Sequence, residues 1–149
     1  QSLFHIDREK NSVKYYKGIK AIKPLYESLI ADIKPNEEYM VIANADLWIH
    51  QDKEFFENFA LRRAQLPIRI MKMIEDNDYA REEIQRRGLF NMDIKLLPKD
   101  LKVESNMVIT PQRTLIHDLQ SPNVALVIEN DVFIQMHQEH FRLLWSFLK

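Results

Sequence analysis

The chain has 149 residues, of which 46% are hydrophobic and 29% charged, values typical of a soluble globular protein large enough to bury a sizeable core. Its 21 Lys and Arg nearly balance its 22 Asp and Glu, and the net charge of -1 excludes a general attraction to nucleic acid or to an anionic membrane. The absence of cysteine excludes disulfides, thiolate metal sites and cysteine nucleophiles, and it is compatible with a cytoplasmic location. No apolar run approaches the roughly 20 residues that a membrane-spanning helix needs, so we expect no membrane partner.

The first half of the chain alternates predicted strands and helices behind a polar lead-in, residues 1–11. Ser12–Tyr16 is predicted as a short strand that ends near Gly18. Apolar residues at helical spacing then indicate a helix over 19–33, and the apolar run EYMVIAN indicates a buried strand over 38–44. The remaining elements of this half are a helix capped by Asp52, a strand over 66–74, a helix that starts after Asp76 or Asn77 and ends at Gly88, and a strand over 92–96.

The second half is predicted to be a meander of strands closed by a long helix. Three candidate strands follow one another over 106–110, 114–119 and 123–129. A helix from about Asp131 to Leu148 is expected to bury its large apolar residues, which are Phe133, Met136, Phe141, Leu144, Trp145 and Phe147. The alternation followed by a meander indicates one α/β domain over 12–149, with a mixed β-sheet sandwiched by helices in the order β-α-β-α-β-α-β-β-β-β-α.

An ordered set of segments along the chain is similar to a known family. The segments are VKYYKGIKAIKPLYESLI at 13–30, YMVIANADLW, FALRRAQLPIRIM, IKLLPKD, ALVIEND and the closing LLWSFLK. From about Val13 onward the chain thereby resembles the effector domain of TrmB-like transcriptional regulators. The resemblance implies a phospholipase-D-like fold, in the form of one half of a phospholipase-D-type protein. It also implies a non-enzymatic domain that senses a small-molecule effector, often a sugar.

The resemblance has further consequences for partners. In the family, the effector domain follows an N-terminal winged helix and a coiled-coil linker, and neither is in this sequence. Because the chain begins with Gln1 rather than Met, we expect it to be a piece of a longer protein. We therefore expect contact with DNA only through the missing N-terminal region, and a homodimer as the working form of a cytoplasmic regulator.

The stretch SNMVITPQRTLIHD, residues 105–118, corresponds to the hairpin on which phospholipase-D-type enzymes carry a His-x-Lys-x4-Asp motif. In that motif the histidine attacks phosphorus and the lysine holds the phosphate oxygens. None of the five histidines here has a lysine two positions further on, and the expected histidine and lysine positions fall near Asn106 and Val108. The sequence therefore predicts a scaffold without catalytic residues, and not an enzyme. The alternatives are a diverged phosphodiesterase on the same fold and a purely structural oligomerisation module.

Candidate ligand-binding residues lie in NADLWIH, residues 44–50, which closes a buried strand. In α/β sheets the carboxyl ends of the strands line the ligand crevice. Asn44 and Asp46 offer hydrogen bonds to hydroxyl groups, and Trp48 offers a flat apolar face to a sugar ring. Asn106 and Glu129, at the ends of other predicted strands, are further candidates. The alternative is that the first two residues only shape a loop, that Trp48 packs on the core edge, and that the end of the last strand caps the terminal helix.

Two groups of residues that contain histidine are explained without a metal site or an acid/base pair. His137 and His140 share a face of the last helix, but a zinc site needs a third ligand and none is nearby in the sequence. We therefore expect a solvated helix, with no metal and no cofactor. His117 and Asp118 are neighbours on a predicted strand and point to opposite faces, which argues against an acid/base pair.

Two arginine pairs resemble a basic site for nucleic acid. Arg62-Arg63 and Arg86-Arg87 both close predicted helices, where cations complement the helix dipole. Since the chain has no excess of positive charge, we interpret both pairs as helix-end residues rather than as a nucleic-acid site.

Overall fold

The structure, a computed structural model, describes residues 11–149. In chain order the elements are β1 (Ser12–Lys17), α2 (Ile19–Asp32), β2 (Glu38–Ala43), α3 (Ala45–Ile49), α4 (Lys53–Ala64), β3 (Arg69–Ile74), α5 (Asp78–Gln85), β4 (Met92–Leu96), β5 (Ser105–Ile109), β6 (Thr114–Asp118), β7 (Val124–Glu129) and α6 (Asp131–Phe147). Most of these bounds agree with the sequence-based prediction to within a few residues.

The strands form one seven-stranded sheet in the order β1-β7-β6-β5-β2-β3-β4. β2, β3 and β4 are parallel, because a helix returns the chain between each successive pair. β5, β6, β7 and β1 are joined to this half by antiparallel pairing. The prediction of an α/β fold, with a mixed sheet between helices, is confirmed.

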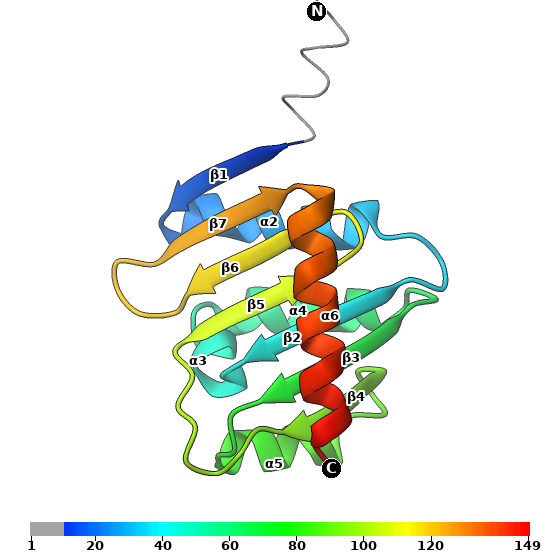
Figure 1. Ribbon diagram of the computed structural model, residues 1–149. Coiled ribbons are helices and arrows are strands. Elements are labelled where there is room, and N and C mark those ends of the chain that lie inside the picture. Colours follow the sequence, from blue (N-terminus) through cyan, green and yellow to red (C-terminus); the bar gives the residue numbers. More distant parts are fainter. Residues whose placement is uncertain (1–10) are drawn as a thin grey trace, which may run out of the picture.

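Helices α2, α3, α4 and α5 cover one face of the sheet, and α6 crosses the other face alone (Figure 1). The larger part of the core lies under the four helices, where Tyr26, Trp48, Phe56 and Phe59 pack together. The Tyr26 ring centroid lies 5.0 Å from that of Phe56 and 5.6 Å from that of Phe59, in edge-to-face geometry. Large aromatic residues of this kind supply much of the apolar area that a fold of this size buries.

The short helix α3 is a difference from the sequence-based prediction, which placed a loop after β2. Asn44 caps the helix, and its side-chain oxygen accepts a hydrogen bond from the Leu47 N–H at 3.0 Å. A helix of five residues is too short to show a helical period, so the sequence pattern does not reveal it.

Helix α6 buries less than the sequence predicts. Ile134 and Phe141 are buried against the sheet, and Trp145 stacks on Phe141 with ring centroids 5.7 Å apart. The predicted burial of the other large residues is wrong, because a single helix on a flat sheet contacts it along one stripe only. These exposed residues are Phe133 (46%), Met136 (45%), Leu144 (47%) and Phe147 (79%). No helix within residues 11–149 is long and apolar enough to cross a membrane.

Candidate functional site

Asn44, a predicted ligand residue, is engaged at both ends of its side chain. Its oxygen caps α3 through the Leu47 N–H. Its amide nitrogen donates to a Glu75 carboxylate oxygen at 3.3 Å and to the Val103 carbonyl at 3.2 Å. These hydrogen bonds connect the carboxyl ends of β2 and β3 to the segment before β5. Asn44 therefore has a structural role at the position where a ligand-binding crevice was predicted.

Asp46 and Trp48 point in different directions from α3. Asp46 stays at the surface, where its carboxylate oxygen lies 3.0 Å from His50 Nδ1. Trp48 is only 5% exposed, and its ring centroid lies 4.5 Å from that of Phe56 and 6.0 Å from that of Tyr26. The indole therefore offers no exposed face to a sugar ring, because the turn of α3 directs it into the core.

Asn106 begins a chain of hydrogen bonds that crosses the core. Its amide nitrogen lies 2.8 Å from the Tyr26 hydroxyl, which in turn lies 2.8 Å from His117 Nδ1. His117 Nε2 lies 2.6 Å from Asn123 Oδ1, and the Asn123 amide donates to Gln51 Oε1 at 2.5 Å. Asn106 and His117 are direct partners on β5 and β6, so the pairing of these strands brings the two side chains to one face.

The protonation state of His117 sets the direction of this chain. Burial lowers the pKa of His117, although the hydrogen bond to Asn123 and the charge of Asp118 act in the opposite sense. The neutral imidazole has one donor, and a carbonyl oxygen only accepts, so we assign the proton to Nε2. His117 Nδ1 then accepts from the Tyr26 hydroxyl, whose pKa is raised chiefly by burial. Successive donors aligned in one direction strengthen one another.

A second buried cluster, which the sequence analysis missed, lies beside Trp48 and Asn106. Arg63 of α4 and Lys72 of β3 are both only 2% exposed. With Trp48 and Asn106 they line a cavity of about 10 Å³. The other lining residues are Tyr39, Val41 and Val108. We refer to this cavity as the cationic cavity.

The two cations have different partners. Lys72 Nζ lies 2.5 Å from Glu83 Oε1, and burial lowers the pKa of Lys72 while the Glu83 charge opposes that shift. The Arg63 guanidinium carbon lies 5.1 Å from the ring centroid of Tyr39 and 5.6 Å from that of Phe59. In the part of the chain that the structure describes, no carboxylate forms an ion pair with Arg63. The cluster therefore combines two positive charges with one negative charge.

Two N–H donors on residues that line the cationic cavity have no partner. Trp48 Nε1 and Arg63 Nε are buried and have no hydrogen-bond partner of good geometry within residues 11–149, although Trp48 lies close enough to the Tyr26 hydroxyl to lower its pKa against the larger effect of burial. A buried unpaired donor costs about 1–3 kcal/mol. Glu83 Oε2 is also unpaired, but Glu83 does not line this cavity. The cavity is therefore suited to a group that accepts hydrogen bonds and carries negative charge.

The signal that could have revealed this cluster is a lysine inside the apolar strand RIMKMI. A charge at such a position needs a buried partner. Arg63 does lie in the last turn of α4, as predicted, but its side chain turns into the core. Its neighbour Arg62 does remain at the surface, where two of its nitrogens lie 2.6 Å from the Glu27 carboxylate.

Glu129 lies at the opposite end of the sheet from Asn44 and Asn106. β7 runs antiparallel to β6, so its last residues lie beside the first residues of β6. The Glu129 carboxylate lies 3.3 Å from Arg113, and its neighbour Asn130 caps α6. The predicted placement of Glu129 in the same crevice as Asn44 is therefore wrong, because the direction of β7 carries it to the other edge.

Within residues 11–149, the histidines of α6 have no further ligands placed to complete a metal site. His137 Nδ1 lies 2.9 Å from the Thr114 hydroxyl, and burial lowers the pKa of His137, with the charge of His140 acting in the same sense. Over residues 11–149 there is no group of three or more His, Cys, Asp or Glu placed to hold a metal ion.

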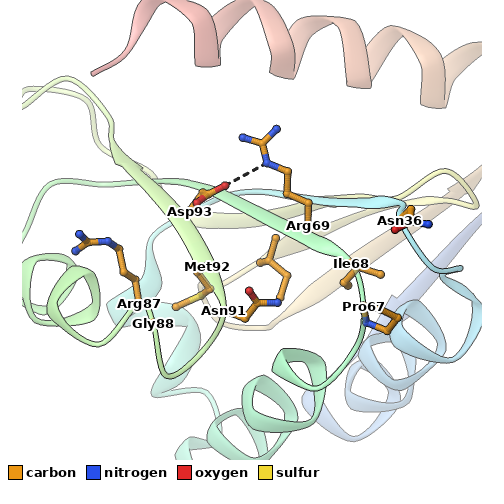
Figure 2. Close-up of a pocket in the computed structure, with 10 residues that line it drawn as sticks. Asn36, Pro67, Ile68, Arg69, Arg87, Gly88, Asn91, Met92 and Asp93 are labelled. Carbon is orange, nitrogen blue, oxygen red and sulfur yellow. Dashed lines mark hydrogen bonds and ion pairs between the residues drawn. The ribbon is translucent and has the colours of Figure 1, made fainter.

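A wider, open pocket of about 530 Å³ lies at the amino ends of β3 and β4 (Figure 2). Arg69 and Arg87 are part of its wall, but Arg69 is held by Asp93 at 3.1 Å. None of the predicted ligand residues lines this pocket. In α/β sheets ligands bind at the carboxyl ends of strands, and the pocket lies at the other end. One of its guanidinium groups is already neutralised, and the pocket is far more open than the cationic cavity.

No protein-family model and no curated protein matches the sequence. Solved structures do match, at low sequence identity. The archaeal chromatin protein TrmBL2, described as showing a novel mode of DNA binding, superposes with a TM-score of 0.64 at 12% identity, over 92% of this chain and 52% of that chain. This chain therefore spans about half the length of TrmBL2. Nuc from Salmonella typhimurium, a phospholipase D family member, superposes with a TM-score of 0.63 at 11% identity, over 93% of this chain and 96% of that chain. NucT from Helicobacter pylori superposes with a TM-score of 0.58 at 11% identity, over 92% of this chain and 97% of that chain.

The likeness to Nuc contradicts the prediction that the chain is not an enzyme. That prediction took the absence of the His-x-Lys pair to be sufficient, whereas Nuc, a member of a family named for an enzyme, shares the fold over nearly its whole length. The predicted fold is confirmed by the same comparison. The chain has a phospholipase-D-like fold.

Proposed function

We propose that residues 12–149 form a single ligand-sensing and dimerisation domain of a TrmB-like transcriptional regulator, in which DNA is bound by a region outside this sequence. The similarity in fold to TrmBL2, a protein described by its mode of DNA binding, supports this class. The net charge of -1 supports a location of the DNA contacts elsewhere, since phosphate binding needs an excess of cations. The observation that carries the proposal is an apolar surface on the side of the sheet that α6 only partly covers.

A row of apolar side chains crosses five strands on this side in direct register. Tyr15 lies beside Leu126, Leu126 beside Ile116, Ile116 beside Met107, and Met107 beside Ile42. Tyr15 is 63% exposed and Leu126 is 37% exposed, while the other three are half-buried. Since neighbouring strands lie about 4.8 Å apart, the row is about 19 Å long.

One flank of α6 extends this row. Arg142, on the other flank, reaches Glu38 at the start of β2 at 3.2 Å. The opposite flank therefore faces the carboxyl end of β2, where the row lies. Phe133 and Leu144 lie on that flank, and the exposed Met136 and Phe147 lie further round the helix, away from the sheet. We refer to the row and this flank together as the apolar face.

The apolar face is an elongated patch on one side of the sheet. The row of about 19 Å runs across the strands, and α6 crosses the strands beside it (Figure 1). Contiguous exposed apolar patches on monomers are often functional. A standard interface buries about 800 Å² on each partner around an apolar centre. A second copy of the chain is the partner we propose, because a two-fold axis lets one patch cover an identical patch.

Sedimentation velocity tests this dimer. We expect the wild-type chain to sediment as a dimer at micromolar concentration. Leu126→Glu should weaken the dimer at least about 100-fold, which is about 2.7 kcal/mol, because a charge buried without a partner costs several kcal/mol. Leu61→Glu is the matched control, since it makes the same change at an exposed leucine of α4, on the other side of the sheet. A monomeric wild type, or equal weakening in both variants, would contradict the proposal.

We propose that a bound ligand shifts the equilibrium between two arrangements of the subunits in the dimer. Asn44, Trp48 and Asn106 border the space between α3 and the sheet, and Asp46 lies at the outer surface of α3. Because the cavity there is about 10 Å³, an effector the size of a sugar would bind only after α3 moves. In a thermal-shift screen, a bound sugar at a hundredfold excess over its Kd should add about 2.7 kcal/mol of stability. If no sugar shifts the wild type and the dimer persists, the structural-module alternative replaces the sensing part.

A further inference from the structure

The cationic cavity has an excess of positive charge that the described residues do not neutralise. Arg63 and Lys72 are both buried, and Glu83 neutralises only Lys72. An ion in a protein interior costs several kcal/mol unless an opposite charge or sufficient hydrogen bonds compensate it. The stacking of Arg63 over Tyr39 and Phe59 offsets part of this cost, since a desolvated cation–π contact is favourable.

Other carboxylates near these helices do not supply the missing charge. Glu75 accepts a hydrogen bond from the Val103 N–H at 2.7 Å and another from the Asn44 amide. Glu57 lines an adjoining hollow of about 20 Å³, which Arg63 and Trp48 also line, but it forms no ion pair with Arg63. The nearest negative charges are therefore engaged elsewhere or lie outside the cavity.

The size and the donors of the cavity define what could occupy it. Its volume of about 10 Å³ leaves room for one occupant about as large as a water molecule. Trp48 and Arg63, whose Nε1 and Nε donors have no partner within residues 11–149, both line it. Water would accept from both donors but would leave the charge in place. A monatomic anion accepts from both donors and also neutralises Arg63.

We propose that the cationic cavity binds one monovalent anion of about halide size. The anion accepts hydrogen bonds from Arg63 and Trp48 and lies in the electrostatic field of Lys72. The adjoining hollow of about 20 Å³ is lined by residues of α3, α4 and α5 and shares Trp48 and Arg63 with the site. The site is separate from the apolar face and does not depend on dimerisation, but it shares Trp48 and Asn106 with the space that a sugar effector would enter.

Crystals of the wild-type protein grown in bromide test the position of the anion. Anomalous diffraction should show one bromide ion in contact with Arg63 Nε and Trp48 Nε1. Ordered bromide only at the surface, or only a water molecule in the cavity, would overturn the proposal. This experiment needs no variant, so it remains decisive if a substitution in the core prevents folding.

Thermal denaturation tests whether the anion binds in solution. Potassium bromide replaces potassium gluconate at constant ionic strength, and gluconate is too large for the cavity. At a tenfold excess of bromide over its Kd, the wild-type Tm should rise by about 4 °C. Arg63→Met should abolish the rise, because it removes the cation and one donor while keeping a side chain of similar length.

Arg62→Met is the matched control, since it removes the same charge from the neighbouring, exposed position of α4. Its Tm should respond to bromide as the wild type does. A wild-type Tm that does not respond would overturn the proposal, as would equal responses in Arg63→Met and Arg62→Met.

Discussion

Replacing Tyr26 by phenylalanine tests the chain of hydrogen bonds that links β5 to α3. The substitution removes one oxygen atom and leaves the ring packed against Trp48 and Phe56. The lost hydroxyl accepts from Asn106 and donates to His117, each over 2.8 Å. Because Asn106 is 2% exposed and His117 is 0% exposed, neither gains a hydrogen bond to water in exchange.

The size of the effect follows from the two groups left behind. A buried donor or acceptor without a partner costs about 1–3 kcal/mol, and Tyr26→Phe leaves one of each. We therefore expect a loss of about 2–6 kcal/mol, a large share of the roughly 5–15 kcal/mol that stabilises a typical domain. In an Asn106→Leu background the same substitution leaves only His117 unpaired. In that background, Tyr26→Phe should lower the free energy of unfolding by about 0.5–3 kcal/mol less than it does in the wild type. This difference is the coupling energy expected between neighbours in one hydrogen-bond network.

Urea denaturation measures this loss as a lower midpoint concentration with an unchanged slope. Tyr16→Phe is the control, since Tyr16 is half-buried and its hydroxyl forms no hydrogen bond within residues 11–149. It should change the free energy of unfolding by less than about 0.5 kcal/mol. If Tyr26→Phe costs no more than Tyr16→Phe, the hydrogen-bond chain contributes nothing measurable to stability and the argument fails.

Three other substitutions or assays address the core, the pH dependence and the DNA contacts. Trp48→Ala should lower the free energy of unfolding by about 3–5 kcal/mol, because a buried indole leaves a cavity, and a loss below about 1 kcal/mol would place Trp48 at a rim instead. Burial lowers the pKa of His117, so the unfolded chain binds more protons than the folded chain. The free energy of unfolding should therefore fall as the pH drops below about 6.5, by up to about 1.4 kcal/mol per pH unit, until the lowered pKa is reached. Urea titrations of His117→Gln should show a flatter dependence, and a slope equal to that of the wild type would argue against the assignment. Fluorescence anisotropy with labelled duplex DNA should show only weak, salt-sensitive binding by this chain, whereas tight and sequence-selective binding would place a DNA site within it.

Local patterns in the sequence determine most of the strands and their ends. β4 begins at Met92 and ends at Leu96, as predicted, because apolar and polar residues alternate through the whole strand. α3 could not be predicted in the same way, since Asn44 is equally typical of a turn. The pattern of α6 predicts an apolar side, but a pattern within one helix does not say how many layers cover it. The exposure of Phe147 reflects the absence, within residues 11–149, of any other helix beside α6 on that face of the sheet.

The cationic cavity could not be predicted because its charges come from elements that are far apart in the sequence. Arg62 and Arg63 are adjacent, but Arg63 falls on the helix face that buries Phe56 and Phe59, whereas Arg62 pairs with Glu27 at the surface. Lys72 signals a buried charge, but its partner Glu83 is known only once α5 is docked on the sheet. The direction of β7 also depends on its pairing with other strands, which the sequence does not reveal. Glu129 was therefore expected beside Asn44 and Asn106, although it lies at the opposite edge of the sheet.

The pairing of β1 with β7 has a consequence for the order in which the sheet forms and opens. Ser12 pairs with Glu129, 117 positions further along the chain, whereas β5, β6 and β7 are joined by short turns. Closing a long loop costs chain entropy that grows with its length, so local hairpins form before such a distant pairing. β1 also has a single neighbour in the sheet and leaves Val13 and Tyr15 exposed. Its amide hydrogens should therefore exchange with solvent earlier than those of β2 and β5, which have a neighbouring strand on each side.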